Sequence, residues 1–210
     1  MPENLSISPA VADFARPDPD AVRRLGALPT ANIGDAMDRL GALDSRIQAA
    51  WPGAKLAGPA FTVWTRAGDN AAIHAALRLA EPGDVIVVNG QGDESRALLG
   101  ELIGGSAAAA GIAGFVLDGA VRDAADLAEL GMPVFARAST PAGPYKNGPG
   151  RLGVPIAVGG VAINLGDIVV GDSDGVVVVP RADAEAVATA AEAVFADEAR
   201  RRETITTTRR

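Results

Sequence analysis

The stretch spanning residues 100–126 constrains the fold of this chain more than any other part of its sequence. It reads GELIGGSAAAAGIAGFVLDGAVRDAAD, in which a Gly/Ala-rich segment typical of a closely packed helix precedes a short apolar strand at residues 115–117. Asp118 and Gly119 have the composition of a turn that ends this strand. Helix, strand and turn together bring the charged residues that follow, Arg122 and Asp123, to one edge of a sheet.

That edge has the chemistry of a site for a small acid. The first N–H groups of the predicted helix, at residues 100–103, have no partner inside the helix and attract a carboxylate or phosphate together with the helix dipole. Ligands of open α/β structures bind at such edges. The Arg122 guanidinium offers planar donors for carboxylate or enolate oxygens, and the Asp123 carboxylate suits a hard divalent cation. An ordinary charged surface turn would have a similar sequence and is the alternative at this point.

Composition bounds the class of protein. With 210 residues, 48% of them hydrophobic, the chain is long enough for one well-buried core and short for two domains. Its net charge of −7, with no basic cluster outside the C-terminal tail, argues against nucleic-acid binding. The sequence has no apolar run of the ~20 residues that span a bilayer and no secretory signal, which predicts a cytoplasmic protein without membrane contact. Because cysteine is absent, any metal must be bound by oxygen atoms or by His74.

The pattern along the chain predicts an irregular arm at residues 1–18, a single domain at 19–203 and a disordered basic tail at 204–210. Thr30 is expected to cap a helix. The other expected elements are a short helix at 20–25, strands at 58–65, 85–88 and 133–136, a polar loop at 139–150 that shapes the site entrance, several short strands within 154–179, and a helix at 182–203 with an apolar face. Mixed strands and Ala-rich helices of this kind predict an α/β fold with a sheet core flanked by helices.

Other candidate sites are weaker. His74 follows Asn70, which lies in a second candidate site loop, by four positions on a predicted helix, but a lone histidine is more often a hydrogen-bonded packing residue than a metal ligand. The glycine-rich residues 89–93 lack the lysine of a phosphate loop and the spacing of a dinucleotide fingerprint, so nucleotide cofactors are disfavoured. Residues 172–175 lack the later glutamate of an EF-hand and predict a tight hairpin.

The central stretch resembles the class II 4-hydroxy-4-methyl-2-oxoglutarate / 4-carboxy-4-hydroxy-2-oxoadipate aldolase family, which also contains the ribonuclease E regulator RraA. The family signature is an acidic residue, twenty intervening positions, Arg-Asp, two further positions and another acid. Glu101, Arg122, Asp123 and Asp126 match it in register. The chain departs from the best-known aldolases in having Glu101 where they have aspartate.

The resemblance covers nearly the whole of residues 30–203 and implies a single-domain, layered β/β/α swivelling-domain fold. It also implies a homotrimer or homohexamer with active sites between subunits. Family enzymes take an acidic residue from the C-terminal helix of the neighbouring subunit, and Glu198 is the best positional match, with Glu203 as the alternative. Pairing of Glu198 with Arg201 or Arg202 on a solvated helix face is the structural alternative.

The resemblance further implies a mechanism. Asp123 would bind Mg²⁺ or Mn²⁺ directly, with Glu101 and Asp126 acting through water. A small 2-oxo acid would be bound by Arg122 and by the start of the helix at Gly100 and Glu101. There the backbone N–H groups of Leu102 and Ile103 would meet its carboxylate. Aldol cleavage or oxaloacetate decarboxylation would then release a pyruvate enolate.

Two other functions are compatible with family membership. A non-catalytic regulator that binds ribonuclease E or another protein is the main alternative, although the retained Arg122, Asp123 and acidic partners favour an enzyme. A methyltransferase would need an adenosyl-methionine-binding glycine motif after the first strand, and the sequence contains none.

Overall fold

The centre of the fold is a mixed β-sheet, seen in a computed structural model that describes residues 4–208. Its four long strands run parallel to one another: β3 (Leu56–Thr65), β4 (Val85–Leu99), β5 (Gly114–Val121) and β6 (Val134–Ser139). The short strands β1 (Leu5–Ile7), β7 (Gly150–Leu152) and β2 (Gln48–Ala49) extend the sheet in the order β1-β7-β3-β4-β5-β6-β2. The parallel strands therefore end at a common edge, where the connections to the helices begin.

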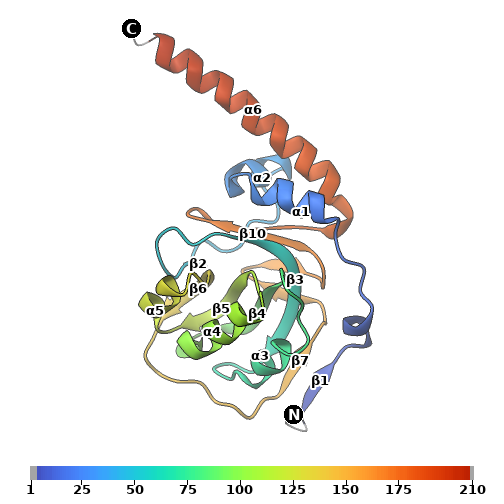
Figure 1. Ribbon diagram of the computed structural model, residues 1–210, viewed down its shortest axis with the longest axis vertical. Helices are drawn as coiled ribbons and strands as arrows, with labels where there is room; N and C mark the ends of the chain where they lie inside the picture. Colours follow the sequence, from blue (N-terminus) through green and yellow to red (C-terminus); the bar gives the residue numbers. More distant parts are fainter. Residues whose placement is uncertain (1–3, 209–210) are drawn as a thin grey trace.

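Three helices cover one face of this sheet (Figure 1): α3 (Ala71–Ala76), α4 (Glu101–Ala109) and α5 (Ala124–Glu129). Alternate strand residues point to this face, as the two-residue period of a strand requires. Ile86 and Val88 of β4 and Phe115 and Leu117 of β5 pack there against the three helices. Gly104 allows the close approach of α4 to α5, because a Cβ at this position would overlap the side chain of Leu127.

The other face of the sheet is covered by further strands. The hairpin of β10 (Ile168–Asp172) and β11 (Gly175–Val179) pairs through β10 with β3, and the small sheet of β8 (Ile156–Val158) and β9 (Val161–Ile163) completes the layer. Val85, Val87 and Val116, which alternate with the helix-facing residues, pack into this second core. The predicted layered β/β/α arrangement and the predicted hairpin at residues 172–175 are thus confirmed.

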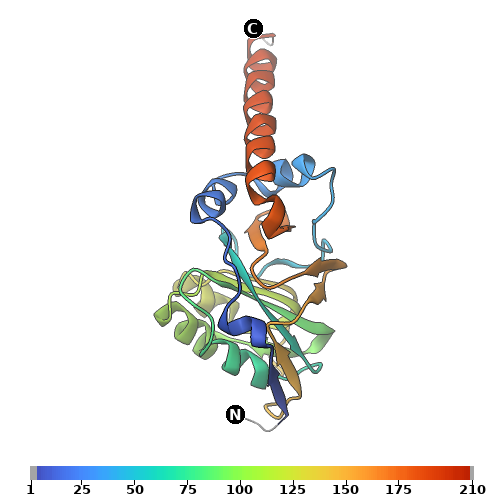
Figure 2. The ribbon, with the colours of Figure 1, turned by 90° about the vertical axis from the view of Figure 1, so that its right-hand side faces the viewer.

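A third group of helices lies on the outer side of the β10–β11 hairpin: α1 (Pro19–Gly26), α2 (Thr30–Ala36) and α6 (Ala184–Thr208). Short 3-10 turns at η1 (Pro9–Ala12) and η2 (Arg181–Asp183) complete the described elements. Figures 1 and 2 show that α6 packs on this group only at its N-terminal part and then projects away from the body. Within residues 4–208, no helix combines the length and the apolar character needed to cross a membrane.

Two local predictions about the strands are wrong. Asp118 and Gly119 lie inside β5 instead of forming a turn after it, because the Asp118 carboxylate is paired with Arg137 and this pairing permits an acid in a buried strand. The glycine-rich residues 89–93 are part of β4, where register shifts against β5 absorb them as an irregular strand. The strand that leads to Arg122 and Asp123 is therefore longer than the sequence pattern indicates.

Two predictions about helix ends also differ from the structure. Thr30 is the first residue of α2 instead of its cap, and its N–H and hydroxyl groups donate to the Asp172 carboxylate at 2.9 and 2.7 Å. At the other end of the chain, α6 continues to Thr208 and so includes most of the tail expected to be disordered. Arg209 and Arg210 lie outside the described residues.

Candidate active site

The site begins at Gly100, the single residue between the end of β4 and the start of α4. Its backbone is extended, with φ −154° and ψ −159°. A Cβ at this position would overlap the Asp123 carboxylate and lie 2.8 Å from Cγ of Arg122. A residue without a side chain is therefore required for Arg122 and Asp123 to approach the first turn of α4.

Arg122 and Asp123 follow the last residue of β5 directly. The Arg122 N–H donates to the Leu99 carbonyl at 3.1 Å, which continues the pairing of β5 with β4 by one residue. Asp123 is the N-cap residue of α5 and has a left-handed backbone, with φ 56° and ψ 39°, which is uncommon for a residue other than glycine. The connection thus turns sharply at Asp123.

The Asp123 carboxylate is only partly engaged by protein groups. Its Oδ2 accepts a hydrogen bond from the Glu101 N–H at 3.2 Å and lies 3.3 Å from Nε of Arg122. No group of residues 4–208 pairs with Oδ1. The Arg122 and Asp123 side chains are 40% and 37% exposed, respectively. One carboxylate oxygen and much of the guanidinium are therefore free for a ligand.

The N-terminus of α4 supplies further donors. No described residue accepts a hydrogen bond from the N–H groups of Leu102 and Ile103. Such unpaired donors, at the positive end of the helix dipole, are suited to a carboxylate. Glu101 and Asp126 are exposed in the first turns of the neighbouring helices α4 and α5. All the predicted residues of the central stretch thus lie together around the ends of β4 and β5.

The start of α4 and Arg122 border a cavity of about 260 Å³, and Glu101, Asp123 and Asp126 lie beside it without lining it. Its lining contains no acidic side chain and consists of Asn70, His74, Leu99, Gly100, Leu102, Ile103, Arg122, Gly143, Pro144 and Lys146. A larger hollow of about 600 Å³ lies near α2 and α6, but its lining is mostly apolar, includes three aspartates and has no cationic group. An anionic ligand therefore fits the smaller cavity better.

The donor set suits a hard divalent cation with few protein ligands. Asp123 Oδ1 is a free carboxylate oxygen, and within residues 4–208 no three His, Cys, Asp or Glu side chains converge on one point. Magnesium binds in this way, through one or two carboxylates and several waters. A transition-metal site built from several side chains of one chain does not match the arrangement.

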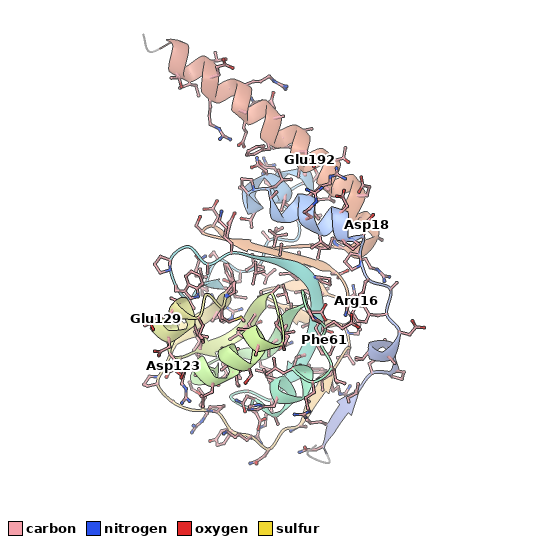
Figure 3. All side chains as sticks on the ribbon, viewed as in Figure 1. Arg16, Asp18, Phe61, Asp123, Glu129 and Glu192 are labelled. Atoms are coloured by element: carbon pink, nitrogen blue, oxygen red, sulfur yellow. The ribbon has the colours of Figure 1, made fainter. Side chains whose placement is uncertain are left out.

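Glu198 does not join the other predicted site residues within one chain. It lies on the projecting part of α6, where Oε2 accepts from NH2 of Arg202 at 2.8 Å. Figure 3 shows Asp123 at the start of α5 and Glu192 on α6, on opposite parts of the molecule. Since α6 runs away from the body after Glu192, a contact between Glu198 and Asp123 would need a second copy of the chain.

The sequence did not indicate all of the cavity residues. The loop predicted at residues 139–150 contributes Gly143, Pro144 and Lys146 to the lining of the cavity, but no pattern indicated Lys146 itself. His74 lies at the cavity with its imidazole on the α3 surface. Partial burial of the ring, together with the positive charges of Lys146 and Arg78, lowers the pKa of His74 below its ordinary value.

Comparisons with known proteins agree with this geometry. The RraA-like family model, described as Aldolase/RraA, matches residues 30–178. A protein of Halalkalibacterium halodurans named "Putative 4-hydroxy-4-methyl-2-oxoglutarate aldolase" is 44% identical over 184 residues, which cover 87% of this chain and 88% of the relative.

Solved structures show the same similarity. An uncharacterized protein from Pseudomonas syringae pv. tomato str. DC3000 superposes with a TM-score of 0.82 at 31% identity, covering 93% of this chain and 92% of that one. Streptomyces coelicolor RraAS2, described as an unusual member of the RNase ES inhibitor RraA protein family, superposes with a TM-score of 0.77 at 32% identity, covering 91% and 98%.

Proposed function

Because the chain belongs to the RraA-like (Aldolase/RraA) family, we propose that it is a class II, divalent-metal-dependent aldolase. It cleaves 4-hydroxy-4-methyl-2-oxoglutarate and related 2-oxo acids to pyruvate, and it decarboxylates oxaloacetate as a second activity. One observation carries this proposal: the free N–H groups of α4 and the Arg122 guanidinium lie at one cavity without an acidic lining, and Asp123, whose Oδ1 pairs with no described residue, contacts both Arg122 and the start of α4.

The 2-oxo acid end of the substrate would be bound first by the protein donors. Its carboxylate accepts hydrogen bonds from the N–H groups of Leu102 and Ile103, which the helix leaves unpaired. Arg122, at the same edge, donates to the carboxylate or to the neighbouring 2-oxo oxygen. The missing side chain at Gly100 keeps this approach open.

Asp123 would hold the cation, Mg²⁺ or Mn²⁺, through Oδ1, the carboxylate oxygen that no group of residues 4–208 uses. When bound, the cation supplies positive charge that polarises the 2-oxo group and offsets the charge of the enolate. The left-handed backbone of Asp123 and the hydrogen bond from the Glu101 N–H to Oδ2 fix the orientation of the carboxylate. Oδ2 is thus held by the protein, and Oδ1 is left for the cation. A single protein carboxylate is enough for this role because magnesium retains water.

Cleavage breaks the C3–C4 bond, and its electron pair moves into the enolate of pyruvate while the C4 hydroxyl loses its proton to become a carbonyl. Arg122 is placed where the enolate oxygen develops its charge, and donors fixed in advance at such a point lower the barrier. Glu101 and Asp126 would order the water that accepts the hydroxyl proton. Decarboxylation of oxaloacetate gives the same enolate, which explains why one site would serve both reactions.

The test is pyruvate release from 4-hydroxy-4-methyl-2-oxoglutarate and from oxaloacetate, measured with Mg²⁺, with Mn²⁺ and with excess EDTA. We expect release from both acids that EDTA abolishes and that either cation restores. Undiminished release in EDTA would contradict the metal-dependent mechanism. Absence of release from both acids under all conditions would contradict the enzyme assignment.

We also propose that the protein forms a homotrimer or homohexamer in which Glu198 of one subunit completes the site of its neighbour. Two features support this: α6 projects from the body, and Leu102, at the cavity, is 76% exposed. An exposed large apolar side chain at a polar site is typical of a surface that a partner covers. The Glu198–Arg202 pair is exposed and would contribute little to stability, so the pair alone gives no reason for a glutamate at residue 198.

Mixing two inactive variants tests this assembly. Glu198→Ala should impair catalysis without changing oligomer size, whereas Asp197→Ala, an adjacent acid that pairs with Arg200 and Arg201, should not. Combining Glu198→Ala chains with Asp123→Ala chains should restore part of the activity, because some interfaces then contain both intact residues. Full activity of Glu198→Ala, or of a monomer, would show that sites are not shared between subunits.

A regulator without catalytic activity is the second candidate, and the similarity to RraAS2 favours it. In that case the cavity would bind no 2-oxo acid and the surface around Arg122 would serve a protein partner. Binding to a ribonuclease E, together with absence of pyruvate release, would support this function over the aldolase.

A further inference from the structure

A second cavity, of about 420 Å³, lies at the end of the sheet where β1, β7 and β3 run side by side (Figure 1). It shares no lining residue with the cavity at the start of α4. We propose that it binds a small aromatic carboxylic acid, whose carboxylate pairs with Arg151 and whose ring packs against Trp64. The site is separate from the candidate active site, and the proposal does not depend on the aldolase assignment.

Three side chains on neighbouring strands form a row at this cavity. Arg151 of β7 is paired in register with Ser6 of β1 on one side and with Trp64 of β3 on the other. Residues paired in this way point to the same face of a sheet. Their chain neighbours Val63 and Leu152 pack in the core under the helices, so the row lies on the opposite face, where all three residues are exposed. The strands thus present the three side chains together to a ligand.

Arg151 supplies a positive charge that the described protein groups do not neutralise. Its guanidinium lies over the Trp64 ring, 5.5 Å from the ring centre, and no carboxylate of residues 4–208 forms an ion pair with it. A guanidinium stacked on an aromatic ring keeps the N–H groups in its own plane free, and these form the fork that binds a carboxylate through two hydrogen bonds. An anion is therefore the partner that Arg151 lacks.

The rest of the lining indicates a ligand with a single negative charge. None of the described residues that line the cavity is acidic, and the other charged one is Arg66. Its NH2 lies 3.2 Å from Oδ2 of the buried Asp69, and its guanidinium lies 5.2 Å from the centre of the Tyr145 ring. Because Asp69 offsets the charge of Arg66, one uncompensated positive charge remains. A carboxylate matches this charge better than a phosphate group, which carries nearly two negative charges at pH 7.

Trp64 carries the argument for an aromatic ring. It is 42% exposed, whereas most large apolar side chains of β3 are buried. Aromatic rings contact one another in offset or edge-to-face arrangements, which adds to the gain from burying apolar surface. Pro149 and Gly150 add apolar surface to the same lining, and the volume of the cavity is in the range of small-molecule sites. A ring bound there would bury Trp64 while its acid group reaches Arg151.

Hydrogen bonds fix the segments around the cavity to one another. Gln91 has a left-handed backbone, with φ 64°, and its Nε2 donates to the Thr65 carbonyl at 2.9 Å. The Arg66 N–H donates to the Pro149 carbonyl at 3.2 Å, which joins the end of β3 to the residues before β7. A site whose walls are already in place loses less conformational entropy when a ligand binds.

Calorimetric titration with benzoate tests the proposal. Benzyl alcohol has the ring without the charge, and cyclohexanecarboxylate has the charge without a flat ring. We expect benzoate to bind with a Kd of about 1 mM or tighter, and each of the other two to bind about 10-fold more weakly. Absence of saturable benzoate binding, or equally tight binding of either matched probe, would overturn the proposal. Phenyl phosphate should also bind more weakly than benzoate, and tighter binding would contradict the choice of a carboxylate.

Substitutions locate the bound benzoate. Arg151→Gln should weaken its binding about 10- to 100-fold, as expected for the loss of hydrogen bonds to a charged group. Arg39→Gln is the matched control, because Arg39 is an exposed arginine on another connection, where it pairs with Asp35. Arg122→Gln should also leave benzoate binding unchanged, since Arg122 lines the other cavity. No effect of Arg151→Gln, or equal weakening by Arg122→Gln, would show that benzoate does not bind at the proposed site.

The fluorescence of Trp64 gives a second measurement. The chain has two tryptophans, and the other, Trp51, donates from Nε1 to the Met132 carbonyl at 2.9 Å. Benzoate should change the emission of the wild-type protein and leave that of Trp64→Leu unchanged, and this variant should bind benzoate about 10-fold more weakly. An equal change of emission in Trp64→Leu, or wild-type affinity in this variant, would contradict the contact with the ring. Should Trp64→Leu fail to fold, the Arg151→Gln titration still decides the proposal.

Discussion

Two Arg–Asp pairs lie in or directly after strand β5, and they differ in burial and in the number of polar atoms that the protein engages. Asp118 lies within β5 and pairs with Arg137 of β6, whereas Asp123 follows β5 and pairs with Arg122. The side chains of the first pair are 12% and 9% exposed, and those of the second 37% and 40%. Five residues of sequence therefore separate a largely buried pair from an accessible one.

The pairs also differ in how many of their polar atoms the protein uses. Asp118 Oδ1 binds Arg137 and Oδ2 accepts from the Gly159 N–H at 3.2 Å, while Arg137 also donates to Asp44. Asp123 Oδ1 pairs with none of the residues that the structure describes. A fully paired, buried ion pair links elements of the fold, since breaking it would strand a charge. A half-paired, exposed one retains the capacity to bind a ligand, which is why we assign chemistry to Asp123 and not to Asp118.

The largest effect should come from Asp123→Asn. Asparagine tolerates a left-handed backbone and its amide oxygen still accepts from the Glu101 N–H, so the fold should be kept while the charge that binds the cation is lost. We expect pyruvate release to fall below detection and the melting temperature to stay within a few degrees of wild type. Glu129→Gln, an exposed acid on α5, is the control and should remain active. Activity of Asp123→Asn at the wild-type level would show that the Asp123 charge has no catalytic role and that Asp123 does not differ from Asp118 in function.

The reverse result is expected for Asp118→Asn. Loss of one partner of a largely buried pair leaves the Arg137 charge uncompensated and should lower the free energy of unfolding by about 3 kcal/mol. For a domain of this size, the melting temperature would fall by about 6–12 °C. The folded fraction should keep its kcat, because Arg137 and the Gly159 N–H engage both carboxylate oxygens of Asp118 and leave none for a ligand. A Tm close to wild type with lost activity would mean that Asp118, too, belongs to the site.

Arg122→Lys should have an intermediate effect. Lysine retains the charge but has no planar fork, so it cannot reproduce two donors directed at the same oxygens. If Arg122 stabilises the developing enolate, kcat should drop by about 100-fold or more. A normal kcat with only a raised KM would instead show that Arg122 contributes to substrate binding alone.

The sequence predicted which residues meet at the candidate site better than it predicted the strands that bring them together. Gly100, Glu101, Arg122, Asp123 and Asp126 lie together because helix and strand periodicity are local properties, and the helix start and the residues after the strand were both recognisable. The prediction of a turn at Asp118–Gly119 was wrong. The Asp-Gly sequence is the same in a turn and in a strand, and here Arg137 of another strand pairs with Asp118 and allows it to lie in a strand. That information lies in the pairing of β5 with β6, which no short pattern contains.

The distant parts of the cavity were also beyond local patterns. Lys146 reaches the site because Asp69, which precedes Asn70, binds the backbone of residues that follow Lys146 almost eighty positions later. A buried aspartate and a loop rich in glycine and proline give no sign in the sequence that they will meet. The length of α6 was underestimated for a related reason: its polar C-terminal part has no apolar face, and its helical form relies on ion pairs within the helix such as Glu198–Arg202.

The smallest effect should appear in the acid range and concerns Asp44, the second carboxylate beside Arg137. Hydrogen bonds from Arg46, first from its side chain and then from its backbone, together with Arg137, lower the pKa of Asp44 well below its ordinary value of 3.8. Because the pKa is lowered in the folded state, the ionised carboxylate stabilises the fold fully above about pH 4, and this contribution is lost as the pH falls through the folded-state pKa.

Asp44→Asn should therefore lower Tm by no more than a few degrees at pH 5–7, since Asp44 is accessible to solvent and its ion pairs are screened. The difference from wild type should shrink as the pH is lowered from 4 towards 2, because Asp44 of the unfolded wild-type chain binds a proton in this range and the folded carboxylate does not, which favours unfolding. Asp38→Asn is the control, because Asp38 lies on the same connection and forms no ion pair with the described residues. A difference that stays constant down to pH 2 would show that Asp44 contributes through packing or neutral hydrogen bonds, and that the network around Asp118 depends less on charge than the contrast with Asp123 implies.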